Sequence, residues 1–189
     1  MTFTKTIASV TLAIALSAGS AFAESHAAMN PMVGGAEMFA DQDIVSNALN
    51  SADHTTLVAA VKAADLVETL QSAGPFTVFA PVNAAFTELP AGTVDTLLMP
   101  ENKAMLTKVL TSHVVAGNWS AADIIAAARR SSDGFYHFEA VSGDALSAQV
   151  RGGKVYIFDE SGNASLVTIA DVKQSNGVIH VVNKVLLPK

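Results

Sequence analysis

Apolar residues between about positions 43 and 130 recur at the three- and four-residue spacing of amphipathic helices. Asp43 or Asp41 can cap a first helix, and the Ser120-to-Asp123 pattern is typical of a capping box at the start of a later one. The spacing predicts helices over residues 44–49, 57–64, 66–70, 94–98, 101–110 and 121–130.

One apolar stretch interrupts these helices. Gly74-Pro75 is a turn signal, and the β-branched and aromatic run 76–79 predicts a buried strand. Pro81 should end this strand because it has no N–H for a strand ladder. We expect Asn83 to cap a helical turn that returns Phe86 to the core.

The period changes from helical to alternating after Ser131. The alternation predicts strands over residues 135–141, 145–150, 155–158, 166–172 and 177–187. Helices followed by a run of strands indicate an α+β fold with a largely antiparallel sheet or sandwich.

The last predicted strand has two faces of different character. Ile179, Val181 and Val185 share one face, which we expect to line the core. The opposite face carries His180 and Lys184, so we expect it to be only partly covered.

Residues 1–23 have the pattern of a secretory signal peptide. Lys5 gives a positive start, residues 7–18 are apolar, and Ala21-Phe22-Ala23 is a cleavage motif before Glu24. The apolar run is too short for a bilayer core of about 30 Å. The pattern therefore predicts export to the periplasm or the medium.

Composition agrees with an exported, acidic protein. The chain has no Cys, so its fold must rest on core packing without disulfides. Its net charge is −6, and removal of residues 1–23 takes away Lys5 and no acid, which leaves about −7. This charge disfavours nucleic acid as a partner, because phosphates need a basic surface.

Residues 24–42 form an N-terminal lead segment without a clear period. It contains Met29, Met32 and Met38, with His26 nearby. Thioethers select Cu(I), so a soft metal site is one interpretation. The favoured one is a pliable strap whose Met side chains fill gaps in the core, because no second His or Cys completes a ligand set.

Two segments resemble the signatures of one family. Residues 76–86 (FTVFAPVNAAF) resemble the first signature of fasciclin (FAS1) domains, and residues 176–188 (NGVIHVVNKVLLP) resemble the second. Residues 110–115 (LTSHVV) resemble the family's Tyr-His motif, with Ser112 in place of the Tyr. The resemblance covers about residues 43–189, which we take as a single domain. The signal peptide and the missing Cys are typical of a bacterial secreted member.

The resemblance implies a wedge-shaped β-sandwich with several helices packed against it. It also implies an extracellular or periplasmic location and a role in adhesion or in surface and matrix interaction. The two strands that carry the signatures should lie close together. The motif residues to which the resemblance gives a structural role are Phe79, Pro81, Asn83, Phe86, His113, Gly177 and His180.

The resemblance also points to a partner-binding region. In animal members an Asp-Ile pair before the second signature is linked to integrin binding, and Asp171-Val172 occupies the matching positions. The Ile-to-Val change and Ser112 both weigh against an animal-type receptor contact. Trp119 lies in a polar loop, either as an interface anchor or folded back on the core. The candidate partner-binding residues are Asp171, Val172, His180 and Trp119.

No catalytic motif is present in the sequence. It has no Gly-x-Ser-x-Gly, phosphate loop or metalloprotease helix. His137 and Glu139 share a strand face, but two ligands rarely hold a metal without a third, so a solvated face is favoured. His113 is expected to be structural and bonded to a backbone carbonyl.

These observations predict a non-catalytic protein without a cofactor. The first hypothesis is an exported binding module for a cell-surface or extracellular protein or matrix component. The alternative is a periplasmic carrier of an apolar small molecule of carotenoid or lipid type, held in a groove between helices and sheet.

Overall fold

The computed structural model describes residues 30–189, so the predicted signal peptide, His26 and Met29 lie outside the described part. Within it the α-helices are α1 (Ile44–Asn50), α2 (Thr55–Ala63), α3 (Val67–Gln71), α4 (Asn83–Thr87), α5 (Thr93–Leu97), α6 (Lys103–Thr111) and α7 (Ala121–Arg130). Two short 3₁₀ helices are η1 (Ala52–His54) and η2 (Pro100–Asn102). The strands are β1 (Met32–Val33), β2 (Ala36–Glu37), β3 (Phe76–Pro81), β4 (Val114–Ala116), β5 (Phe135–Glu139), β6 (Ala145–Arg151), β7 (Lys154–Phe158), β8 (Ala164–Gln174) and β9 (Gly177–Val182).

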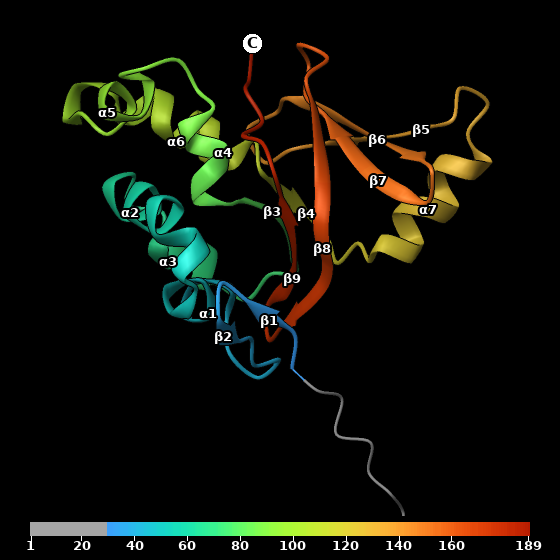
Figure 1. The fold of residues 1–189 in the computed structure, drawn as a ribbon, viewed down its shortest axis with the longest axis horizontal. Helices are drawn as coiled ribbons and strands as arrows, with labels where there is room; N and C mark the ends of the chain where they lie inside the picture. The colour runs from blue at the N-terminus through green and yellow to red at the C-terminus, as the bar shows by residue number, and fades with distance from the viewer. Residues whose placement is uncertain (1–29) are drawn as a thin grey trace, which may run out of the picture.

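Seven strands form one mixed sheet in the order β4-β3-β9-β8-β7-β6-β5. Only β3 and β9 run parallel, and the other neighbours are antiparallel. Strand β8 has two register shifts against β9, and the sheet bends along this long strand (Figure 1). A bridge from Val115 to Ala140 joins the two ends of the sheet, which is nearly closed. The predicted α+β architecture is confirmed.

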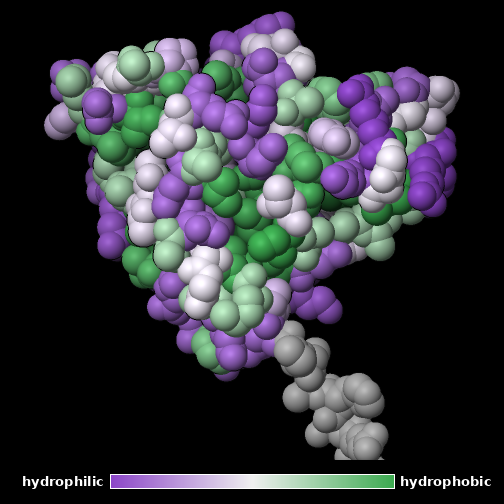
Figure 2. All heavy atoms as spheres, viewed as in Figure 1, coloured by the Kyte–Doolittle hydropathy of each residue, from purple (hydrophilic) through white to green (hydrophobic). Residues whose placement is uncertain are grey.

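The nearly closed sheet creates two hydrophobic clusters, one on each face of β3. Val78 and Ala80 point into the first cluster, where the sheet meets α1, α2, α3 and α6. Phe79 points into the second, which includes Ile124 of α7 and Ile157 of β7. Helices α1 to α6 lie on one side of the molecule and α7 on the other (Figure 1). On the face in Figure 2, apolar side chains gather where the helices meet the strands.

The prediction that the His180 face of the last strand is only partly covered is wrong for the residues of β9. Val178, His180 and Val182 are 2%, 1% and 0% exposed. The reason is that the sheet folds over this strand, so both of its faces are internal. The strand also ends at Val182, earlier than predicted, and Lys184 beyond it is exposed.

The stretch 74–86 forms the predicted strand and helical turn. Strand β3 ends at Pro81, and Phe86 packs against the first cluster. The predicted cap is wrong, because Asn83 is itself the first residue of α4 and does not cap it. Its side-chain oxygen instead accepts the Thr56 N–H at 3.0 Å and so caps α2.

The lead segment from residue 30 onward packs on the domain as a two-stranded hairpin, β1–β2. Met38 is 2% exposed in the first cluster, as the strap interpretation predicts, whereas Met32 is 55% exposed. Gly34 lies so close to the η1 turn that an added Cβ would be 2.3 Å from Ser51 Oγ. The hairpin is therefore seated directly on residues 51–54.

Candidate functional site

Three of the four candidate partner-binding residues, Asp171, His180 and Trp119, lie together in one hydrogen-bonded group. Val172 follows Asp171 at the irregular part of β8, His180 lies on the adjacent strand β9, and Trp119 precedes α7. Trp119, Asp171 and His180 span more than sixty residues of sequence, and hydrogen bonds through His180 join them. The Val172 side chain lies in the first cluster instead. The sequence resemblance named the residues, and only the fold connects them.

His180 is the centre of this group. Its Nε2–H donates to the Trp119 carbonyl at 2.8 Å, and its Nδ1 accepts the Asp171 N–H at 3.3 Å. Burial lowers the pKa of His180, so the neutral ring is favoured. One nitrogen donates and the other accepts, so a neutral imidazole satisfies both contacts. His180 therefore ties the α7 loop to the β8 irregularity.

Asp171 is the exposed member of the group. Its backbone is left-handed, with φ of 59°, which is uncommon for a residue other than Gly. Its Oδ1 accepts the Ala121 N–H at 2.7 Å, at the first residue of α7. A carboxylate is favourable at this end of a helix because of the helix dipole. Asp171 thus anchors α7 and still presents a charge to solvent.

Trp119 folds back on the second cluster while one edge stays accessible. Its ring lies 5.3 Å from that of Tyr136, and its Nε1–H donates to the Ala116 carbonyl at 3.1 Å. Thr77 on β3 accepts the Trp119 N–H at 2.9 Å. Ser120 begins α7 with the predicted capping box to Asp123. The loop is therefore fixed at several points before any partner arrives.

Two of the four candidate partner-binding residues are buried and cannot contact a partner directly. Val172 and His180 are each 1% exposed. His180 stacks on Phe79 and is bonded to the loop before α7, whereas Val172 packs in the first cluster beneath the β1–β2 hairpin. A partner could reach Asp171 and the half-buried Trp119, and we place direct contact with a partner on these two residues as a prediction.

Three further family-motif residues, Phe79, Pro81 and Gly177, lie in the interior. Phe79 stacks on His180 with ring centroids 5.7 Å apart, which brings the two signatures into contact. Gly177 pairs with Phe76 at the start of the parallel β3–β9 pair, so the predicted closeness of these strands is confirmed. Pro81 is buried at the end of β3.

His113 has the predicted structural role. Its Nδ1–H donates to the Val109 carbonyl at 2.7 Å, and its Nε2 accepts the Leu186 N–H at 2.8 Å. Burial lowers the pKa of His113 to about 4. The ring joins the end of α6 to the C-terminal segment.

His137 and Glu139 are both exposed on β5. His137 pairs with Asp133 at 2.8 Å, and this hydrogen bond lowers the pKa of the Asp133 carboxyl. Among residues 30–189 no three His, Cys, Asp or Glu side chains lie close enough together to hold a metal ion.

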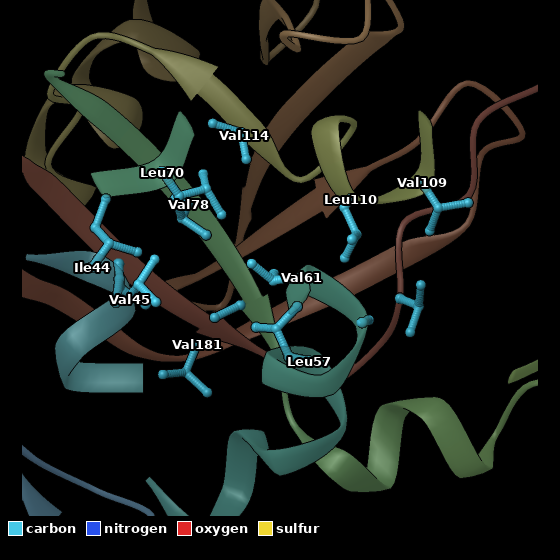
Figure 3. Packing of buried hydrophobic residues seen from close by; sticks show 14 of the residues in the cluster. Ile44, Val45, Leu57, Val61, Leu70, Val78, Val109, Leu110, Val114 and Val181 are labelled. Carbon is cyan, nitrogen blue, oxygen red and sulfur yellow. The ribbon is translucent and has the colours of Figure 1, made fainter. Parts of the chain in front are cut away.

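An apolar hollow of about 60 Å³ lies between the helices and β3, where the carrier hypothesis expects a groove, but the sequence did not identify its lining residues. Ile44, Leu57, Val61, Leu70 and Val78 are part of its lining (Figure 3). They come from α1, α2, α3 and β3 and share only an apolar character. Lys62 lies at the hollow, and its side chain is exposed.

The fasciclin domain model matches residues 52–188. The chain belongs to the fasciclin (FAS1) domain family. No helix in the part of the chain that the structure describes has the length and hydrophobicity needed to cross a bilayer.

Two bacterial proteins and one insect structure are among the matches. The chain is 50% identical to Protein sll1483 of Synechocystis over 145 residues, 77% of this chain and 73% of that protein. It is 41% identical to the cell surface glycolipoprotein MPB83 of Mycobacterium bovis over 101 residues, 50% of this chain and 44% of that protein. The structure is similar to a FAS1 domain pair of the insect cell adhesion molecule Fasciclin I, with a TM-score of 0.68 and 19% identity over 77% of this chain and 51% of that one.

Proposed function

We propose that this protein is an exported, non-catalytic FAS1 binding module that mediates adhesion or contact with a cell-surface or extracellular protein or matrix component. Family membership is the observation that carries the proposal, and a cell-surface relative supports it. The predicted signal peptide supports action in the periplasm or outside the cell.

The surface formed by Asp171 and Trp119 is the proposed contact region. A partly exposed Trp is typical of interface anchors, and the exposed Asp171 carboxylate adds a charge at the start of the same helix. The region is held rigid by the His180 contacts and the α7 capping box, so little ordering entropy is lost on binding. The net charge of −6 favours a partner with a basic or neutral surface.

The test uses purified exported protein on beads, with attachment to intact cells and to matrix-coated surfaces measured against buffer-blocked beads. Asp171→Asn removes the charge but keeps an oxygen to accept the Ala121 N–H, whereas Asp171→Ala removes both. If the charge is recognised, both variants lose attachment by about tenfold or more. Glu101→Gln, an exposed acid-to-amide change at η2, is the matched control and should bind normally.

Trp119→Ala tests the second half of the same surface. We expect reduced attachment, and far-UV circular dichroism should confirm that the fold is kept. If both Asp171→Asn and Trp119→Ala attach as well as wild type, the partner does not bind at Asp171 and Trp119. A deletion strain with unchanged biofilm and surface attachment would count against the adhesion function itself.

A second candidate function is carriage of an apolar small molecule, and the hollow beside β3 is the observation that favours it. About 60 Å³ is well below the roughly 300–1,000 Å³ of drug-sized pockets. A carotenoid or lipid would therefore insert one end, or α2 and α3 would move outward.

Extraction of protein purified from its own host, followed by mass spectrometry, tests carriage directly. Val58→Phe places a ring in the wall of the hollow and should displace the molecule. Ala59→Phe, the exposed neighbour on α2, is the matched control and should retain it. Colourless, lipid-free protein from the native host would contradict this candidate.

A further inference from the structure

The apolar hollow between the helices and β3 has a buried interior and a partly exposed apolar rim. Val61 and Val78 belong to its buried part (Figure 3). Five apolar side chains of the lining keep part of their surface accessible: Val58, Leu66, Val67, Phe76 and Val141. Accessible apolar surface gathered around a hollow is typical of a binding site for an apolar group.

The lining contains four polar side chains, and two of them have their polar atoms already in use. His113 uses both ring nitrogens for backbone partners. The Thr111 hydroxyl donates to a carbonyl of its own helix at 2.7 Å. The other two are Lys62 on α2 and Thr69 on α3, and both side chains are exposed. The interior of the hollow is therefore apolar, and its free polar groups lie at the rim.

Lys62 brings a positive charge to this rim. Its stem can lie along apolar surface while the ammonium group stays in water. The ion pairs among residues 30–189 use other cations, namely Lys103, Lys108, His137 and Lys184. Asp65 and Glu68 border an open depression together with Lys62, but Asp65 pairs with Lys103 and Glu68 is exposed. The Lys62 ammonium is thus free to meet an anion at the mouth of the hollow.

An apolar interior beside one positive charge matches a molecule with an apolar chain and an anionic head. The hollow is only about 60 Å³, so an unbranched alkyl chain enters more readily than the methyl-branched chain of a carotenoid. A neutral carotenoid would also leave the Lys62 charge unused. A phospholipid carries two chains side by side, which needs a wider opening.

We propose that the hollow takes the alkyl chain of a single-chain fatty acid and that Lys62 binds its carboxylate. The Thr69 hydroxyl is a further donor in the same lining. This assignment rests on the proposed carrier function and narrows its ligand from the carotenoid or lipid type to a single-chain monocarboxylate. It is separate from the surface formed by Asp171 and Trp119.

The test is isothermal titration calorimetry of the purified exported protein with dodecanoate and with dodecanol, which share the alkyl chain and differ in the charge of the head. Wild-type protein should bind dodecanoate about fivefold more tightly, as expected for a solvent-accessible ion pair. Added salt should reduce this preference by screening the charges. From octanoate to dodecanoate, each further CH₂ that enters the hollow should tighten binding about fourfold.

Variants of the rim and the wall separate the two parts of the ligand. Lys62→Met removes the charge but keeps a long side chain, so it should abolish the preference for dodecanoate and leave dodecanol binding unchanged. Lys62→Arg keeps the charge and should keep the preference. Lys154→Met, at an exposed lysine of β7 outside the lining, is the matched control. Val58→Phe fills part of the hollow and should weaken binding of both molecules by about tenfold or more.

The outcomes distinguish this inference from the carrier function on which it rests. Equal affinity for dodecanoate and dodecanol, or an unchanged preference in Lys62→Met, would overturn the carboxylate assignment while carriage of an apolar molecule stands. Binding that Val58→Phe leaves intact would show that the chain lies elsewhere. No binding of either molecule by wild-type protein would overturn both. Far-UV circular dichroism of each variant establishes that its fold is kept.

Discussion

At the scale of single residues, three histidines are buried, and two of them connect elements that are far apart in the chain. His113 joins α6 to the C-terminal segment, and His180 joins β8 to the α7 loop. His54 packs under the hairpin with Ser51. Burial lowers the pKa of all three, so the neutral imidazole belongs to the folded state.

Replacement of His113 by Asn should destabilise the fold by about 2–4 kcal/mol, because the Val109 carbonyl and the Leu186 N–H lose their partner inside the core. Urea unfolding followed by circular dichroism measures the change. His137→Asn is the control: His137 is exposed, and its loss should change stability little. Equal effects of the two substitutions would contradict a structural role for His113.

The same histidines predict loss of stability in mild acid. In the unfolded chain a histidine takes up a proton below about pH 6.5. In the folded protein burial lowers the pKa of His113 to about 4, so its ring stays neutral until that pH. Stability should therefore be full above about pH 7 and fall between pH 6.5 and 4, by on the order of 3 kcal/mol from His113. Urea midpoints at pH 7, 6 and 5 test this, and His113→Asn should flatten the profile. A midpoint unchanged from pH 7 to 5 would rule it out.

At the scale of elements, the parallel pair β3–β9 carries both family signatures and separates the two hydrophobic clusters. The main chains of the two strands lie close together at Gly177. A Cβ there would lie 2.0 Å from the Phe76 carbonyl oxygen, which is backbone and cannot move aside alone. The glycine is needed for close approach of two main chains.

Gly177→Ala should accordingly push β9 away from β3 and cost more than about 3 kcal/mol of stability, or prevent folding. Gly162→Ala is the control: its φ is +83°, but its Cβ would meet nothing, so only the backbone cost of about 1–2 kcal/mol applies. Thermal melts of the two variants make the comparison. A Gly177→Ala variant as stable as the Gly162→Ala variant would show that the strands can separate freely.

At the scale of the whole molecule, the two clusters share the strands β3 and β9. Ala80 and Val181 face the first cluster, and Phe79 and Val182 face the second. Unfolding of either cluster therefore uncovers strands that the other needs. The bridge from Val115 to Ala140 adds a second connection across the nearly closed sheet.

We expect one cooperative unfolding transition. Trp119 is the only Trp in the chain and packs on the second cluster, so its fluorescence reports that side. Far-UV circular dichroism mainly reports the helices, most of which cover the first cluster. The two signals should give coincident urea transitions. Separate midpoints would mean that the clusters unfold independently.

Much of the fold was predictable from local patterns. The helix caps at Asp43 and Ser120, the buried strand at 76–81 and the alternating strands after Ser131 follow from rules that act over a few residues. The family signatures added the contact between β3 and β9. The cap by Asn83 was assigned to the wrong helix, because its partner Thr56 lies 27 residues away.

The sequence by itself therefore determined most of the secondary structure, the family and the structural role of His113, because each depends on residues near in the chain or on a recognisable motif. Only the tertiary structure decided that His180 and Val172 are buried, that Asp171 anchors α7, and that Lys62 lies at an apolar hollow. These facts depend on how the sheet bends and nearly closes. The sequence pattern of one strand cannot reveal whether a distant helix or strand covers its second face.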